Sequence, residues 1–100
     1  MIYSILAPKL VEFKPKYQFD LGQKFKLLCY LYKGDKPINF IWTKNGMEIL
    51  SNIRYRIETS EDESRLTIEQ LSIDDAGNYS CSANSKHGID QQSAQLVVKG

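Results

Sequence analysis

One tryptophan, one tyrosine and two cysteines stand at spacings that restrict the folds open to this chain. Trp42 follows Cys29 by thirteen residues, and Tyr79 lies two residues before Cys81. Residues of these types surround one another at the centre of a sandwich of two β-sheets, where such a tyrosine holds a corner of the chain. Leu66 lies on an alternating segment between them. We therefore predict an all-β sandwich with Trp42, Leu66 and Tyr79 in its core.

Short segments of alternating apolar and polar residues, separated by turns, make up most of the sequence, as is typical of all-β proteins. We expect about eight strands in a single domain over residues 1–100, with its core within about 8–99. The expected strand segments are 8–13 continuing as 17–20, 24–31, 38–43, 47–49, 53–59, 65–69, 78–84 and 94–98. Pro15 breaks the first strand, because proline donates no hydrogen bond to a sheet, and residues 17–20 are expected to join the other sheet.

Two turns and one helical piece complete the expected chain path. Asn45-Gly46 is the strongest hairpin signal in the sequence, because both residue types tolerate positive φ. Lys86-His87-Gly88 is expected to form the last hairpin, with Gly88 in a left-handed conformation. Residues 72–76 form the only helix-like segment, which is at most one turn long.

Composition argues against nucleic-acid and membrane-spanning roles for this segment. Thirteen basic and twelve acidic residues leave a net charge of +1 without a basic cluster, so no nucleic-acid partner is expected. No stretch approaches the roughly 20 apolar residues that a membrane helix needs, and residues 1–6 are too short for the apolar part of an export signal. The flanks at residues 1–7 and 99–100 are expected to be cut ends of an excised module, with Met1 either an added start or the native one.

The sequence contains no recognisable motif of catalytic residues. His87 is the single histidine and has no nucleophile signature around it. Asp74 and Asp75 are adjacent on a turn, where a structural role for Asp75 with Arg54 or Arg56 is the better interpretation. The six glycines are scattered across turns and form no phosphate-binding loop. We therefore expect no enzymatic activity, no cofactor and no small-molecule substrate.

The two cysteines lie 52 positions apart. This spacing matches no metal-binding motif, so no metal site is expected. The residues alone leave two states open for the cysteines. They form a disulfide, which persists only in an oxidising compartment, or they remain buried free thiols that pack as small apolar groups.

Four features, in order and at matching spacing, resemble the intermediate set of immunoglobulin domains, known as the I-set. They are Cys29, Trp42, the segment Leu66-Thr67-Ile68, and the run from Asp75 to Asn84. The resemblance covers nearly the whole chain, from Pro8 to Lys99. It implies an immunoglobulin-like Greek-key sandwich with a disulfide between Cys29 and Cys81 that joins the two sheets. Residues 47–53 are too few for the extra strands of an antibody variable domain.

Three segments are similar to domains of the arthropod-type Down syndrome cell adhesion molecule family. They are residues 22–29, 34–42 and 76–81. Members of that family are membrane-anchored receptors that recognise themselves homophilically. The likeness implies an extracellular domain that binds protein, with a second copy of itself as the expected partner in a weak homodimer. I-set domains also occur in muscle filament proteins, so an intracellular structural spacer with reduced cysteines is the alternative, followed by a ligand-binding receptor of immune type.

Asn78-Tyr79-Ser80 is an N-glycosylation sequon. Asn78 should face solvent, because the tyrosine beside it faces the core. We expect a glycan on Asn78 if the chain is secreted, whereas a chance occurrence of the triplet is the alternative. A glycan there would cover the sheet that contains Phe40, Asn78 and Leu96, and would leave the opposite sheet for a partner.

The opposite sheet carries the candidate binding residues. Leu28 and Tyr30 are expected to form an exposed apolar pair among charges, as in many protein interfaces. A two-fold contact needs a self-complementary patch, so Arg56 is expected to meet Glu69 of a second copy. The full set of candidates is Lys26, Leu28, Tyr30, Arg54, Arg56, Glu58, Thr67 and Glu69. The alternative is an ordinary surface whose charges pair only within one chain.

Overall fold

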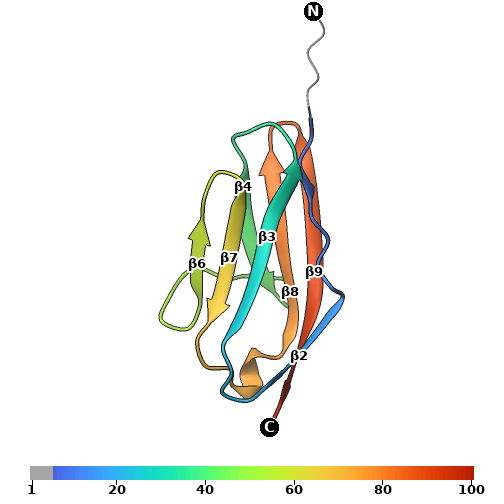
Figure 1. Ribbon diagram of the computed structural model, residues 1–100. Helices are drawn as coiled ribbons and strands as arrows, with labels where there is room; N and C mark the ends of the chain where they lie inside the picture. The colour runs from blue at the N-terminus through green and yellow to red at the C-terminus, as the bar shows by residue number, and fades with distance from the viewer. Residues whose placement is uncertain (1–5) are drawn as a thin grey trace, which may run out of the picture.

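The computed structural model describes residues 6–100 and confirms the all-β sandwich (Figure 1). The described residues form nine strands, one more than expected, because the segments before and after Pro15 are two separate strands. The strands are β1 (Lys9–Leu10), β2 (Lys16–Asp20), β3 (Phe25–Lys33), β4 (Asn39–Lys44), β5 (Met47–Glu48), β6 (Arg56–Thr59), β7 (Glu63–Ile68), β8 (Gly77–Ser85) and β9 (Gly88–Lys99). One 3-10 helix, η1 (Ile73–Asp75), lies within the predicted single turn. The predictions for Met1 and the export signal fall largely outside the described residues.

The strands form two sheets that stack face to face (Figure 1). One has the order β1-β3-β7-β6 and the other the order β2-β9-β8-β4-β5. In Figure 1, β3, β6 and β7 lie nearer the viewer, and the two ends of the described chain lie at opposite ends of the sandwich. Residues 6–100 contain no helix that is long and apolar enough to cross a membrane.

The first strand is shorter than the predicted range 8–13, because side chains of β9 take its backbone N–H groups. The N–H of Leu10 donates to Oδ2 of Asp90 at 2.8 Å, and the N–H of Phe13 donates to Oε1 of Gln92 at 3.2 Å. The segment has two residues paired with β3 and one further hydrogen bond, from the N–H of Val11 to the carbonyl oxygen of Tyr30 at 3.0 Å, and then runs beside β9. After the proline, β2 pairs with β9 in parallel, which confirms the predicted switch between sheets.

Strand β3 presents alternate residues to the two sides of its sheet. Phe25, Leu27 and Cys29 are buried, whereas Lys26 and Leu28 are exposed. This is the phase that the alternation of apolar and polar residues predicts. It fixes which side chains of this sheet are available to a partner.

A disulfide joins the two sheets at the centre of the core. It connects Cys29 to Cys81 with an S–S distance of 2.07 Å. Trp42 lies opposite Cys81 on the neighbouring strand, and its Nε1 donates a hydrogen bond to Oγ of Ser64 at 2.8 Å. Ser64 lies opposite Cys29, so the indole spans the sandwich beside the disulfide. The predicted core is confirmed, since Trp42, Leu66 and Tyr79 are each at most 2 % exposed.

Both predicted tight turns are present. Asn45 and Gly46 have φ angles of 50° and 83° and connect β4 to β5. Gly88, with φ at 147°, follows the turn between β8 and β9. A Cβ atom on Gly88 would lie 3.1 Å from the Cβ of Ala7, so glycine also lets the amino-terminal segment approach this turn.

Strand β6 begins later than the predicted residue Ile53. Asn52 folds the chain before it, since its Oδ1 accepts hydrogen bonds from the N–H groups of Arg54 (2.7 Å) and Tyr55 (2.8 Å). Asparagine makes local turns of this kind because its side chain competes with the sheet for backbone groups. Ile53 is therefore fully exposed in the turn, at 103 % of its reference area, and lies outside the strand.

Candidate protein-binding face

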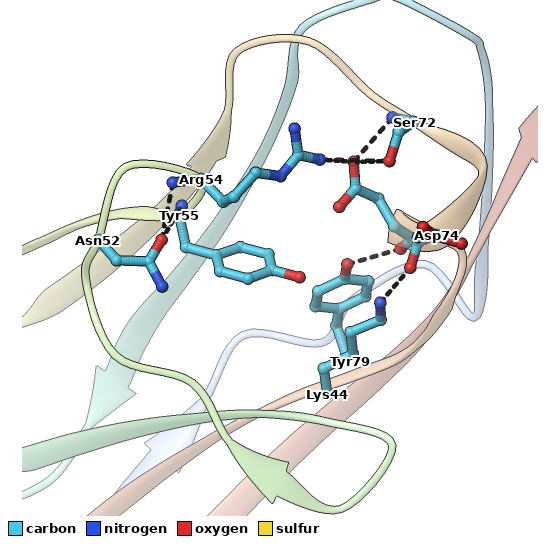
Figure 2. Close-up of polar contacts among 8 residues, drawn as sticks. Lys44, Asn52, Arg54, Tyr55, Ser72, Asp74 and Tyr79 are labelled. Carbon is cyan, nitrogen blue, oxygen red and sulfur yellow. Dashed lines mark hydrogen bonds and ion pairs between the residues drawn. The ribbon is translucent and has the colours of Figure 1, made fainter.

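Arg54 lies in a polar corner of the sandwich and not on the predicted binding face (Figure 2). Its Nη2 donates to Oδ2 of Asp75 and contacts Oγ of Ser72 at 3.4 Å. The same Oδ2 accepts the N–H of Ser72 at 2.8 Å, and the hydroxyl of Tyr79 donates to the carbonyl oxygen of Asp75 at 2.6 Å. The corner carboxylate thus holds the guanidinium of Arg54, whose side chain is 45 % exposed, so its role as a contact residue stays a prediction. The structural interpretation of Asp75 is confirmed.

Asp75 is only 2 % exposed, and its donors determine its charge state. Burial alone would raise the pKa of the Asp75 carboxyl, but hydrogen bonds from Arg54 and Ser72, together with the charge of Arg54, hold that pKa below its usual range. The pKa of Arg54 is raised, chiefly by its hydrogen bond to Asp75. Burial also raises the pKa of the Tyr79 hydroxyl. The corner therefore holds an ionised pair with a structural role.

The exposed side of the four-stranded sheet carries most of the predicted contact residues. We call this surface the β3 face. Leu28 and Tyr30 lie on β3 with 40 % and 44 % of their areas exposed. The exposed predicted residues that this face brings together are Lys26, Leu28, Tyr30, Arg56, Glu58 and Glu69.

Ion pairs within the chain occupy one half of the β3 face. Nζ of Lys24 lies 3.3 Å from Oε2 of Glu69, and Nη1 of Arg56 lies 2.8 Å from Oε1 of Glu69. Nε of Arg56 is also 3.5 Å from Oε1 of Glu58. The pKa of Glu69 is lowered, chiefly by its hydrogen bond from Lys24. The expected contact of Arg56 with Glu69 of a second copy is therefore replaced by the same pair within one chain.

Thr67 lies under this half of the face and cannot act as the predicted contact residue, since it is only 1 % exposed. It stands on β7 between Lys26 of β3 and Arg56 of β6. Long basic side chains commonly lay their methylene groups over shorter neighbours, and Thr67 has a basic residue opposite it on each neighbouring strand. Its hydroxyl has no hydrogen-bond partner among the described residues.

The other half of the β3 face carries no ion pair among residues 6–100, and we call it the open half. There Leu28 lies opposite Arg65, and Tyr30 lies opposite Glu63. Tyr32 continues the row along β3 and is 68 % exposed. The predicted set omits Tyr32 and Glu63. The period-two alternation could have indicated both, since Tyr32 continues the outward positions Leu28 and Tyr30 of β3, and Glu63 lies two residues before the outward Arg65 of β7. A hollow of about 180 Å³ at the edge of this half is lined by Glu58, Thr59, Ser60, Glu63 and Arg65.

Asn78 lies on the exposed side of β8, in the other sheet, as predicted. Its backbone N–H donates to Oδ1 of Asn45 at 2.9 Å. The hydroxyl of Ser80, the third residue of the sequon, lies 2.8 Å from the hydroxyl of Ser93 on β9. The sequon therefore belongs to a regular strand whose asparagine is exposed.

The residues considered for catalysis lie far apart. His87 is in the turn between β8 and β9, where its N–H donates to Oγ of Ser85 at 3.0 Å. Asp74 is exposed on η1, at the other end of the sandwich (Figure 1). In the part of the chain that the structure describes, no group of three or more His, Cys, Asp and Glu residues is placed to hold a metal ion.

Two sheets joined by a disulfide beside a tryptophan, with a tyrosine that closes the corner before the second cysteine, define an immunoglobulin-type domain. The model of the immunoglobulin I-set domain family matches residues 8–98. The chain belongs to the immunoglobulin I-set family, which confirms the resemblance seen in the sequence.

Known proteins similar to this chain include adhesion molecules and titin. Cell adhesion molecule DSCAML1 of Gallus gallus is 33 % identical over 99 residues, which cover 96 % of this chain and 5 % of that protein. The chain thus spans only a small part of this relative. Among solved structures, the Dscam1 Ig7 domain, isoform 5, superposes with a TM-score of 0.89 and 26 % identity over 96 % of this chain and all of that one. The titin fragment I67–I69 superposes with a TM-score of 0.84 and 31 % identity over 95 % of this chain and 33 % of that one.

Proposed function

We propose that this chain is a recognition domain of a membrane-anchored cell-surface receptor, and that it binds a second copy of itself through the open half of the β3 face. The observation that carries the proposal is the pair Leu28 and Tyr30, which are 40 % and 44 % exposed in the middle of a sheet surface. An apolar centre with a charged rim is typical of protein interfaces. Tyrosine is also among the residue types that contribute most to binding energy. The likeness to cell adhesion molecules supports the same function.

A glycan on Asn78 is part of this proposal. The side chain is exposed on the sheet opposite the β3 face, so a glycan there leaves the open half accessible. The mass of the domain secreted from eukaryotic cells should exceed the polypeptide mass, and Asn78→Gln should remove the excess. A secreted domain with the bare polypeptide mass would contradict this modification.

The proposed interface is small, so one domain alone should bind weakly. A standard interface covers about 800 Å² of each partner, whereas this chain exposes 6491 Å² in all. The open half offers only a few exposed side chains of two strands, among them Leu28, Tyr30, Tyr32 and Arg65. Weak contacts of this kind gain strength when several domains of two long receptors engage together.

Leu28→Asp is expected to abolish self-association while the domain stays folded. The substitution places a charge at the apolar centre, where a partner would remove it from water. Sedimentation velocity from micromolar to millimolar concentration measures the effect. Leu50→Asp is the matched control, because Leu50 is 68 % exposed and lies in the loop between β5 and β6, away from the β3 face. Dimers that survive Leu28→Asp would show that another face binds, and a wild-type domain that stays monomeric at millimolar concentration would contradict self-binding.

A second candidate function, an intracellular spacer, is favoured by the 31 % identity to the titin fragment. It requires reduced cysteines, since disulfides are rare in reducing compartments. Denaturation of freshly isolated native material in excess alkylating reagent, without a reducing agent, separates the two functions, because the fully buried cysteines become accessible only on unfolding. Labelled Cys29 and Cys81 support the spacer, whereas protected cysteines support the cell-surface domain.

A further inference from the structure

The open half of the β3 face has a self-complementary charge arrangement. We propose that two copies meet about a two-fold axis that crosses the strands, so that Arg65 of each copy pairs with Glu63 of the other. This inference rests on the proposed self-binding and adds its register and the residues that set its specificity.

Two rows of side chains run across β3 and β7 on the open half. The lower row contains Leu28 opposite Arg65, with Glu58 of β6 on the other side of Arg65, and the upper row contains Tyr30 opposite Glu63. Each row thus joins one apolar residue of β3 to one charged residue of β7. The rows are two residues apart along each strand, a distance of about 6.8 Å.

A two-fold axis parallel to the sheet, across the strands and midway between the rows, exchanges the rows between copies. Each strand then lies over the same strand of the second copy, in the opposite direction. Leu28 faces Tyr30 of the second copy, and Arg65 faces Glu63 of the second copy. The contact therefore contains an apolar pair and a charge pair, each formed twice, as a two-fold interface requires.

An axis that runs along the strands gives a poor contact. With the axis midway between β3 and β7, Leu28 would lie over Arg65 of the second copy and Tyr30 over Glu63. Each charge would then lose water to an apolar neighbour without gaining a partner, which is costly. The arrangement of the two rows thus selects the axis across the strands.

Among the remaining charged side chains of the β3 face, Lys26 also has no ion pair among residues 6–100, but it lies two residues before Leu28, where this axis places it over Tyr32 of the second copy and not over a charge. Arg56 and Glu69 already pair with each other at 2.8 Å, and Glu58 pairs with Arg56. Arg65 is exposed and Glu63 is half-buried, and neither has an ion-pair partner among residues 6–100. They are therefore the acid and the base on the open half that are available to a second copy.

Charge pairs at an interface contribute to specificity more than to affinity. The pair formed by Arg65 and Glu63 should therefore decide which copies associate, while Leu28 and Tyr30 supply most of the attraction. A copy with a changed charge at either position would meet like charge twice in a symmetric dimer. Such repulsion is a common way to exclude wrong partners.

The test uses three variants, which are Arg65→Glu, Glu63→Arg and the double exchange Arg65→Glu/Glu63→Arg. Each single variant should associate with itself at least about a hundredfold more weakly than wild type, because like charges then face each other at both contacts. A mixture of the two single variants should form a heterodimer, since one carries two acids and the other two bases. The double exchange should associate with itself as wild type does, yet fail to pair with wild type.

Sedimentation velocity of single species and of mixtures with one fluorescent component measures these outcomes, and thermal unfolding checks that each variant folds. Recovery in the mixture of single variants cannot come from misfolded protein, so it supports the register directly. If wild type associates, Leu28→Asp abolishes association and Arg65→Glu leaves it unchanged, the register is overturned while the self-binding face stands. If wild type does not associate at all, the proposed function itself fails.

Discussion

Replacement of both cysteines, in Cys29→Ala/Cys81→Ala, is expected to lower the free energy of unfolding by about 4 kcal/mol. The bond closes a loop with a sequence separation of 52 residues, so its loss returns a large amount of conformational entropy to the unfolded chain. Both cysteines are fully buried beside Trp42, where alanine also leaves unfilled space. Natural domains have only about 5–15 kcal/mol of stability, so this variant should be close to the limit of folding.

Urea unfolding of wild type and of the double variant, followed by the fluorescence of Trp42, measures this loss. Wild type unfolded with a reducing agent serves as a control and should lose a similar amount. A loss below about 1 kcal/mol would contradict the proposed role of loop closure and would mean that the sheets hold together without the cross-link.

Asp75→Asn is expected to cost about 2–3 kcal/mol. The carboxylate is buried, and its Oδ2 accepts hydrogen bonds from Arg54 and Ser72. Asparagine can keep one acceptor oxygen there, but it removes the negative charge that pairs with the guanidinium. Removal of one partner of a fully buried ion pair costs about 3–5 kcal/mol. The side chain of Arg54 is 45 % exposed, so water compensates for part of its loss.

The same corner gives the domain a specific dependence on acid. The pKa of Asp75 is lower in the folded chain than the value of about 3.9 expected for an unfolded one. Its contribution to stability is therefore fully present above the unfolded pKa and is lost as the pH falls through the folded pKa. The stability difference between wild type and Asp75→Asn should be constant near neutral pH and should shrink below about pH 4.

Urea unfolding at several pH values measures this difference. Asp74→Asn is the matched control, since the neighbouring Asp74 is exposed and its replacement should change stability by less than about 0.5 kcal/mol. An Asp75→Asn variant that is as stable as Asp74→Asn at neutral pH would contradict the assigned role of the corner.

The buried framework was predictable because each of its residues obeys a local rule. Alternation along Phe25, Leu27 and Cys29 fixes which side of β3 faces the core, and Asn45-Gly46 fixes one hairpin. These rules depend on backbone geometry and on the contrast between apolar and polar residues. Both are written in a few neighbouring positions of the sequence.

Two details of the structure depend on side-chain contacts that the alternation of apolar and polar residues does not encode. Arg54 follows a strand pattern, yet Asp75, 21 positions away, holds it in the corner. Asn52 takes two backbone N–H groups that a strand would use, so β6 starts late. The contact of Arg54 joins segments that only the complete fold brings together, whereas the contacts of Asn52 are local and lie within three residues.

The candidate binding face was predictable only in outline. The alternation of apolar and polar residues predicted that Leu28 and Tyr30 are exposed, but it could not predict that Arg56 pairs with Glu69 within one chain. It also could not show that Thr67, which has the outward phase, is covered. Both results depend on how long side chains lie across neighbouring strands, and the strand pairing sets that arrangement.

The most direct test of self-binding is a dilution series of the isotopically labelled domain, observed by two-dimensional NMR. Concentration-dependent shifts should appear for the backbone amides of Leu28, Tyr30, Glu63 and Arg65, while those around Asn78 stay unchanged. Spectra that are identical from micromolar to millimolar concentration, or shifts confined to the sheet that carries Asn78, would contradict self-binding through the β3 face.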